Sequence, residues 1–188
     1  IILALGPEPS LRWRAFSEQL MGVADHFGAS MMLTLGALLA DVPHSRPVQI
    51  IGTATDQDLI ERYSLQRSRY EGPTGIIGVI HDTCSTTALP SIALWAAVPA
   101  YASQVPSPKA SLSLMRRACE IIGTPAPVAS VMNLIDRYEE QVNSLVEDDE
   151  DLAAYVERLE TMTDQGMSID DEVDDGQLQF DFAEDTGD

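Results

Sequence analysis

Apolar positions in the first 125 residues follow two alternating patterns. Short continuous apolar runs are typical of strands buried on both faces of a sheet, and apolar residues spaced by three and four are typical of helices with one buried stripe. The runs predict strands at about 1–5, 31–36, 48–54 and 92–98, and the spaced patterns predict helices at about 10–27, 55–63, 75–87 and 107–123. This order predicts an α/β fold with a mostly parallel sheet covered by helices.

Capping residues predict where several of these helices start. Ser10, Thr74 and Ser107 each stand just before a helical pattern, where a side-chain oxygen can accept from the first turn. Thr55 together with Asp58 resembles a capping box. The first helix is expected to bury a stripe of Trp13, Phe16, Leu20, Val23 and Phe27.

The pattern changes after residue 125. Two amphipathic stripes flank an acidic run and predict an antiparallel helical hairpin over residues 126–164. Residues 165–188 are acidic and poor in large apolar side chains, which is typical of disorder. We therefore expect an α/β core over residues 1–125, the hairpin and an acidic tail. Because Ile1 already lies in an apolar run, we also expect the core to lack its N-terminal part.

The charge is concentrated near the end of the chain. The formal net charge is −19, and residues 147–188 carry 17 Asp and Glu against the single Arg158, a net of −16. Binding to nucleic acid or to an anionic membrane requires clustered Lys and Arg, and the chain has one lysine. We therefore expect neither as a partner. A lesser hypothesis is that the acidic tail imitates an anionic polymer, although such runs usually serve only for solvation.

Cysteine use and hydropathy favour a cytoplasmic protein. Cys84 and Cys119 lie inside apolar helical patterns, where two buried thiols are expected rather than a disulfide. No segment resembles a signal peptide, and no apolar run approaches the roughly 20 residues that span a bilayer.

Motifs of common catalytic and cofactor sites are absent from the sequence. It has no Gly-x-Ser-x-Gly elbow, Walker loop, dinucleotide glycine fingerprint or paired-cysteine metal motif. His26, His44 and His81 lack the close spacings of metal ligands. We predict no metal site, no cofactor and no catalytic residue, and we interpret His81 as a packed or hydrogen-bonded core histidine.

The loop after the second predicted strand carries the best candidates for ligand binding. Asp41, His44 and Arg46 bring an acid, an imidazole and a guanidinium together within six residues, at the edge where open α/β sheets bind ligands. Glu8 and Arg12 follow the first predicted strand and are candidates for the same site. The alternative is a rigid loop whose prolines and charges bond only its own backbone.

A second candidate is the turn before the helix at 75–87. Gly72, Thr74 and Gly75 leave backbone N–H groups free at the helix start, which is the physical basis of anion binding there. Tyr70, just before this turn, is a further candidate, but Tyr70 and Glu71 would line a surface rather than a pocket if the glycines serve only for packing. The alternative is that the glycines only permit close packing of the helix on the sheet.

Four ordered motifs stand out along the chain. They are Gly-Pro-Glu-Pro-Ser-Leu-Arg-Trp (6–13), Gly-Ala-Leu-Leu-Ala-Asp-Val-Pro-His-Ser-Arg-Pro (36–47), Tyr-Glu-Gly-Pro-Thr-Gly-Ile (70–76) and Leu-Trp-Ala-Ala-Val-Pro-Ala-Tyr (94–101). Together they resemble the bacterial branch of the proteasome assembly chaperone 2 family, over about residues 1–160. The resemblance implies a phosphorylase-like α/β fold, more chain ahead of Ile1, and no reaction common to the family. It also implies protein binding, since the eukaryotic relatives bind proteasome subunits during assembly.

The resemblance ends at the C-terminus. Proteasome-binding chaperones of this group often end in a hydrophobic residue, a tyrosine and one more residue, whereas this sequence ends Glu-Asp-Thr-Gly-Asp. If Asp188 is the true end, the helical hairpin is the better candidate for the binding surface.

Two functional hypotheses follow from the sequence. The leading one is a non-enzymatic module that binds protein partners, with proteasome subunits as candidates, and that forms a homo-oligomer. The alternative is a phosphorylase-like or hydrolase-like enzyme, or a small-ligand binder, that uses the strand-edge loops around His44 and needs a closed pocket there.

Overall fold

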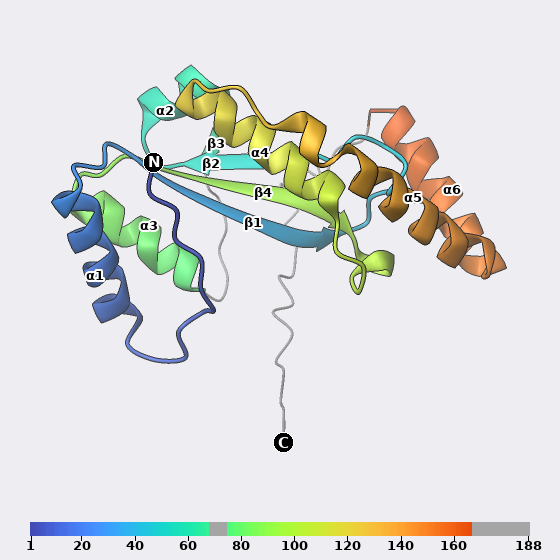
Figure 1. Cartoon of the computed structure of the whole chain (residues 1–188), viewed down its shortest axis with the longest axis horizontal. Helices are drawn as coiled ribbons and strands as arrows, with labels where there is room; N and C mark the ends of the chain where they lie inside the picture. The colour runs from blue at the N-terminus through green and yellow to red at the C-terminus, as the bar shows by residue number, and fades with distance from the viewer. Residues whose placement is uncertain (68–74, 167–188) are drawn as a thin grey trace. The chain divides into compact units, whose positions relative to one another are not determined.

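Strands and helices are interspersed along the first 122 residues, as expected for the α/β class. The computed structural model describes residues 1–67 and 75–166. Its helices and strands are α1 (Trp13–His26), β1 (Met32–Ala40), β2 (Ile50–Ala54), α2 (Gln57–Tyr63), β3 (Gln66–Arg67), α3 (Ile76–Thr86), β4 (Ser91–Pro99), α4 (Pro108–Ile122), α5 (Met132–Glu147) and α6 (Glu150–Asp164) (Figure 1). Short 3₁₀ turns cover Ala100–Ala102 and Val128–Ser130. The α/β class is confirmed.

The sheet is mixed rather than uniformly parallel. Its strand order is β1-β4-β2-β3. Strands β1 and β4 are parallel, because paired residues rise in number together along both strands. Met32 N–H donates to Pro90 O, and further along Gly36 lies against Trp95. Strands β4 and β2 are antiparallel, because Ala97 N–H donates to Gln49 O while the earlier Leu94 lies against the later Gly52.

The direction of β2 has a simple cause. The connection 41–49 between β1 and β2 carries no helix, and a parallel return normally needs a crossover of about a dozen residues or more. β2 therefore runs against β1 and β4, whereas β3 runs parallel to β2 after the crossover through α2. Two of the three strand pairings, β1 with β4 and β2 with β3, are thus parallel, and the sequence analysis did not predict the antiparallel pairing of β4 with β2.

The structure divides into two compact units. Unit 1 consists of Ile1–Leu35 and Gly52–Leu94, and unit 2 consists of Gly36–Ile51 and Trp95–Asp188.

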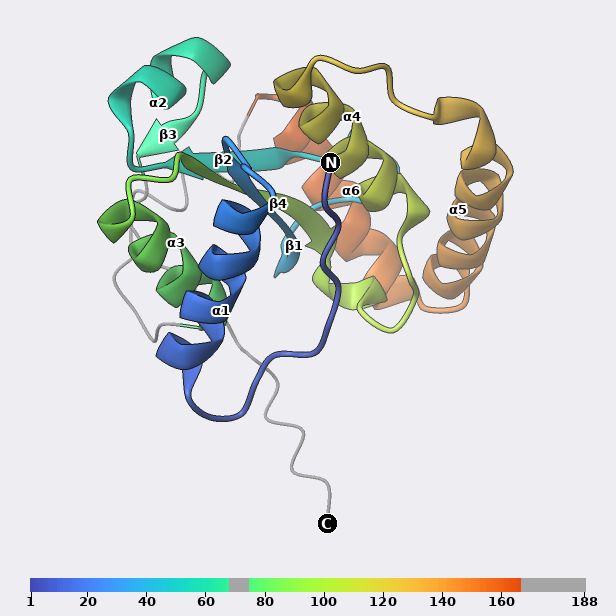
Figure 2. The ribbon, with the colours of Figure 1, turned by 60° about the vertical axis from the view of Figure 1, so that its left-hand side comes forward.

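The core of unit 1 lies between α1 and α3, which Figures 1 and 2 both show side by side. Its buried members are Met21, Ile76, Ile80 and Cys84, and Trp13 and Leu20 pack against them. The predicted stripe of α1 is wrong in part, because the buried residues are Ser17, Met21 and Ala24.

Three residues of the predicted α1 stripe remain largely exposed. Phe16 is 39% exposed, Val23 44% and Phe27 65%. The described residues of unit 1 therefore cover only part of the apolar surface of α1.

The helix starts differ from their predictions at three places. Gly75, not Thr74, is the N-cap of α3. Arg12, not Ser10, is the N-cap of α1; it has a left-handed φ of 59° and makes no side-chain capping bond. Asp56, not Thr55, caps α2, and its carboxylate accepts from the backbone of Asp58 and Leu59. The predicted cap of α4 is confirmed, because Ser107 Oγ accepts from the backbone nitrogen of Ala110.

The strand predicted at residues 1–5 does not form. Ile1, Leu3 and Leu5 are 96%, 92% and 105% exposed, and no described strand pairs with this segment. A strand gains stability from a neighbouring strand and a covered face, and apolar composition alone supplies neither.

Among the described residues of unit 2, two clusters of buried residues form part of the core. One consists of Leu38, Ala40, Val42 and Ala97, with Ile51 and Trp95 packed against it. The other consists of Ala102, Tyr138 and Val142 and joins the turn after β4 to α5. Helices α5 and α6 lie side by side in Figure 1, and Asp149 caps α6 after a short acidic turn.

Candidate functional site

The loop 41–47 leaves β1 in unit 2 and contains three of the predicted site residues. Val42, Pro43 and His44 are buried, whereas Asp41 and Ser45 are exposed. Val42 belongs to a core cluster of the unit. The apolar residues of the loop thus fix its backbone, and its polar side chains face the helices and turns around it.

His44 is 4% exposed, and both of its ring nitrogens are hydrogen-bonded. Its Nε2 lies 2.8 Å from Asn143 Oδ1 on α5, which can only accept. Its Nδ1 lies 2.8 Å from the hydroxyl of Tyr101. This pattern assigns the proton to Nε2 and makes Nδ1 an acceptor. Neither nitrogen is left for proton transfer to a ligand.

Tyr101 joins the loop to the turn after β4. Its hydroxyl also accepts from the backbone N–H of His44 at 2.8 Å. The Tyr101 ring meets His44 and Tyr155 edge to face, with centroids 6.0 and 6.2 Å apart. Burial raises the pKa of Tyr101 to about 12, against the opposing effect of the bond from the His44 backbone. The hydroxyl therefore stays protonated and can donate to Nδ1 at neutral pH.

The charged residues at the two ends of the loop both bond to α6. The Tyr155 hydroxyl donates to Asp41 at 2.7 Å, and burial followed by this bond raises the pKa of Tyr155 to about 12. Arg46 donates through Nε and Nη2 to the two oxygens of Asp164, both at 2.8 Å.

The Arg46–Asp164 contact is a bidentate pair, which is the strongest geometry available to a guanidinium and a carboxylate. It raises the pKa of Arg46 and lowers the pKa of Asp164. Glu160 lies 3.4 Å from Arg46 and also accepts from Ser45. Two successive loop residues are thus tied to the last two turns of α6.

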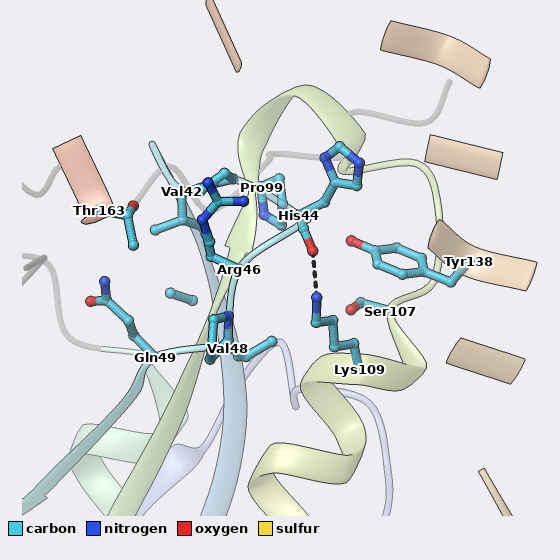
Figure 3. Close-up of a pocket in the computed structure, with 13 residues that line it drawn as sticks. Val42, His44, Arg46, Val48, Gln49, Pro99, Ser107, Lys109, Tyr138 and Thr163 are labelled. Carbon is cyan, nitrogen blue, oxygen red and sulfur yellow. Dashed lines mark hydrogen bonds between the residues drawn. The ribbon is translucent and has the colours of Figure 1, made fainter. Parts of the chain in front are cut away.

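Lys109 connects the loop to both α4 and α5. Its ammonium donates to the backbone oxygen of His44 at 2.7 Å (Figure 3). It also donates to Glu139 Oε1 at 2.7 Å. The side chain is 17% exposed. Partial burial of the charged ammonium costs solvation energy, and the hydrogen bonds to these two oxygens compensate for that cost.

The space between the loop and these helices is small. A cavity of about 10 Å³ lies among residues of the loop, β4 and the three helices (Figure 3). That volume holds about one water molecule. We call the loop 41–47 and the side chains that bond it to α4, α5 and α6 the clasp. The clasp leaves little room for a small-molecule substrate.

The other predicted site residues lie in unit 1 or outside the described residues. Glu8 Oε1 accepts from the backbone N–H of Ile76 at 2.8 Å, directly after Gly75, the N-cap of α3. A carboxylate of the chain itself thus occupies the place where an external anion was predicted to bind. Arg12 is exposed at the start of α1. Tyr70, Gly72 and Thr74 lie outside the described residues.

The predicted residues thus form two groups. Asp41, His44 and Arg46 share the clasp of unit 2, whereas Glu8, Arg12 and Gly75 belong to unit 1. Sequence reasoning missed the partners of the clasp, namely Tyr101, Lys109, Asn143, Tyr155, Glu160 and Asp164. Asn143, Glu160 and Asp164 lie between the apolar positions of the two predicted helices, and no pattern in the sequence marks them as partners of the loop.

A second polar cluster is partly buried in unit 1. His81 Nε2 lies 2.8 Å from Thr34 Oγ1, and Nδ1 lies 2.9 Å from Ser91 Oγ. Burial lowers the pKa of His81 and raises that of the neighbouring Cys84 thiol. Each ring nitrogen thus meets a hydroxyl, and His81 is a bonded core histidine.

The described residues contain no group of three or more His, Cys, Asp and Glu that could hold a metal ion. Within the same part of the chain, no helix combines the length and apolar character needed to cross a bilayer.

Comparisons with known proteins place these features in context. A family model described as the PAC2 family matches residues 1–146. The solved structure of a PAC2 family protein from Streptomyces avermitilis is 40% identical over 80% of this chain and 63% of that one, with a TM-score of 0.73. A proteasome-assembly chaperone homologue from Mycobacterium tuberculosis is also 40% identical, over 79% of this chain and 63% of that one, with a TM-score of 0.70.

A more distant match shows the fold alone. An archaeal homologue of proteasome-assembly chaperone from Pyrococcus furiosus is 16% identical over 78% of this chain and 66% of that one, with a TM-score of 0.57. No curated protein matches the chain. The chain spans less than two thirds of the length of the first two solved structures.

Proposed function

The chain belongs to the PAC2 family, and on this premise we propose that it is a non-enzymatic protein-binding module with a chaperone-like role. The observation that carries the proposal is the 40% identity to a proteasome-assembly chaperone homologue. The proposed partners are proteasome subunits. The proposal includes a homo-oligomeric, cytoplasmic protein with the phosphorylase-like strand arrangement that the family resemblance implies.

The proposed contact surface, called the α5 strip, is the side of α5 that carries two exposed leucines with the exposed Gln141 between them. Leu134 and Leu145 are 49% and 45% exposed. They are eleven residues apart, about three helical turns, so they point to the same side of the helix. Apolar side chains that remain exposed on a helix surface are candidates for partner contacts.

The clasp around His44 supports this function indirectly. Asn143 bonds the loop from α5, and Asp164 bonds it from α6. These bonds fix the hairpin within unit 2 and would present its outer strip in one orientation. Preorganisation of this kind reduces the entropic cost of binding a partner. The loop residues then act by positioning the hairpin, not by binding a ligand.

The test is binding to purified α-type and β-type proteasome subunits of the same organism, measured by native mass spectrometry and by titration. Leu134→Ser with Leu145→Ser should weaken binding by about tenfold or more if the strip contributes a hot spot. Met132→Ser is the matched control, because Met132 is 46% exposed on a different side of the same helix.

Two results would contradict the proposal. If the unaltered chain binds neither type of subunit and a pull-down from cell extract recovers no specific protein, the function is wrong. If the double variant and the control bind equally well, the α5 strip is not the contact surface.

A further inference from the structure

Residues 1–5 of unit 1 form an exposed apolar segment, which we call the arm. Its sequence is Ile-Ile-Leu-Ala-Leu. Ile1, Leu3 and Leu5 are 96%, 92% and 105% exposed. Ile2, between two of them, is only 48% exposed. This difference between neighbours is typical of extended backbone, in which successive side chains point to opposite sides.

Strand β1 has an open side in the described sheet. It lies at one end of the strand order β1-β4-β2-β3, so β4 is its single described neighbour. The Met32 N–H points to that neighbour, because it donates to Pro90 O directly before β4. Successive N–H groups of a strand alternate between its two sides, so those of Leu33 and Leu35 point to the open side. The Leu35 side chain is also 50% exposed.

The open side of β1 lacks the features that normally protect an edge strand. Edge strands are usually short, or are interrupted by charged residues, prolines or bulges. β1 is nine residues long and reads Met-Leu-Thr-Leu-Gly-Ala-Leu-Leu-Ala, without a charged residue or a proline. An edge of this length and composition favours the addition of a further strand.

The chain between the arm and β1 has the form of a parallel crossover. It contains α1, and a helix is the usual connection between parallel neighbouring strands. α3 precedes β4 in the same way, and Figure 2 shows α1 and α3 side by side. Glu8 fixes the start of this crossover through its bond to the Ile76 N–H. A strand before α1 would therefore reach the open side of β1 in the parallel direction.

We propose that the arm docks on the open side of β1 as an added parallel strand, and that the structure shows it in the undocked position. The arm, Leu33 and Leu35 all belong to unit 1. Docking would pair the backbone of the arm with the backbone groups of these two leucines. It would also bring apolar side chains of the arm beside Leu35 and remove them from water.

The arm is thus a movable cover for an edge that would otherwise accept an extended segment of another protein. A second copy of the chain and a partner protein are the other possible sources of such a segment. The arm is favoured because residues 6–31 join it to β1 and keep it near the edge at a high effective concentration. The α5 strip takes no part in this docking, so the inference does not depend on the proposed function.

The test is amide hydrogen exchange of the full chain, followed by NMR at the level of single residues. The amides of Leu33 and Leu35 should exchange about tenfold or more slower than an unprotected amide. Met32 and Thr34 are internal references, because their N–H groups point to β4. If Leu33 and Leu35 exchange as fast as unprotected amides, the arm does not dock and the inference is wrong.

A variant of the arm tests whether the arm itself gives this protection. Leu3→Asp with Leu5→Asp should speed exchange at Leu33 and Leu35 by about tenfold or more, because docking would then desolvate carboxylates. Exchange at the two references should not change. Leu11→Asp is the matched control, since Leu11 is 80% exposed and lies outside the arm. It should leave exchange at both leucines of β1 unchanged, and an equal effect of the two variants would contradict the inference.

A mixing experiment identifies the source of the added strand. Isotope-labelled chain with Leu3→Asp and Leu5→Asp is mixed with an excess of unlabelled, unaltered chain. Exchange at Leu33 and Leu35 of the labelled chain should stay fast. Recovery of protection would show that the arm of a second copy occupies the edge, and would overturn the inference.

Two further outcomes would also overturn it. If Leu33 and Leu35 become protected only after a proteasome subunit is added, the edge serves a partner protein. If the variant of the arm also loses protection at Met32 and Thr34, the arm is required for folding and is not a movable cover. A loss of subunit binding with unchanged exchange in β1 would bear on the α5 strip alone.

Discussion

The hydroxyl of Tyr101 lies 2.8 Å from both the backbone nitrogen and the ring Nδ1 of His44. One hydroxyl therefore accepts from the main chain and donates to the side chain of the same residue. Asn143 completes the arrangement from the other side of the imidazole. The buried polar groups of His44 are satisfied by residues 57 and 99 positions away in sequence.

Removal of the Tyr101 hydroxyl should therefore destabilise the chain. Tyr101→Phe leaves the buried N–H and Nδ1 of His44 without a partner, at a cost of about 1–3 kcal/mol in the free energy of unfolding. Tyr155→Phe is the matched control, because it loses one bond to the exposed Asp41 and should cost about 1 kcal/mol or less. Urea unfolding of both variants measures the difference. Equal effects would show that Tyr101 does not hold the loop.

The Arg46–Asp164 pair should give a stability contribution that depends on pH and salt. The folded pKa of Asp164 is lowered, chiefly by its hydrogen bond with Arg46. The contribution is therefore complete above the ordinary pKa of about 3.9 and is lost as the pH falls through the lowered value. Asp164→Asn should lower the midpoint of thermal unfolding at pH 7, and the difference from the unaltered chain should shrink below about pH 4 and in high salt. A difference that persists at pH 2 would rule out this ion pair as its source.

His81 should make unit 1 sensitive to mild acid. Its folded pKa is lowered by burial, so its contribution to stability is complete above the unfolded value of about 6.5 and is lost as the pH falls toward the folded value. His81→Phe leaves the hydroxyls of Thr34 and Ser91 without their ring partner and should cost about 1–3 kcal/mol at pH 8. Denaturant unfolding from pH 8 to pH 5 should show this cost becoming smaller. A constant cost would mean that His81 does not titrate differently in the folded chain.

Any side chain at Gly36 should lower the free energy of unfolding. A Cβ at Gly36 would lie 2.5 Å from Cζ3 of the Trp95 ring, so Gly36→Ala should destabilise by about 1–3 kcal/mol through overpacking. Gly22→Ala is the control, because nothing lies within 4 Å of its added Cβ and it sits in α1. That variant should stabilise by about 0.5–1 kcal/mol. Thermal unfolding of the pair measures the contrast, and similar shifts would contradict the close approach of Trp95.

Sequence patterns were sufficient for elements with strong local signals. The predicted helix 75–87 is found as α3 (Ile76–Thr86), and the predicted strand 92–98 is found as β4 (Ser91–Pro99). A continuous apolar strand after an amphipathic helix has few alternatives, because burial of both strand faces requires that pattern. The cap at Ser107 is equally local.

Long-range features were beyond such patterns. The direction of β2 depends on how the connection 41–49 returns to the sheet, and the orientation of α1 depends on which part of its apolar arc α3 covers. The clasp is a further example, because the sequence marks His44 as unusual without indicating that Tyr101 and Asn143 bind it. The sequence identified the reactive groups of the loop, but it could not identify the residues that form hydrogen bonds with them.

The engagement of Lys109 has a practical consequence for mapping partners. It is the single lysine of the chain, and its amine is held by Glu139 and the His44 backbone. Amine-directed cross-linkers would therefore find no lysine on the α5 strip. Carboxylate-directed reagents, or a photoreactive group placed at Leu145, would report on this surface instead.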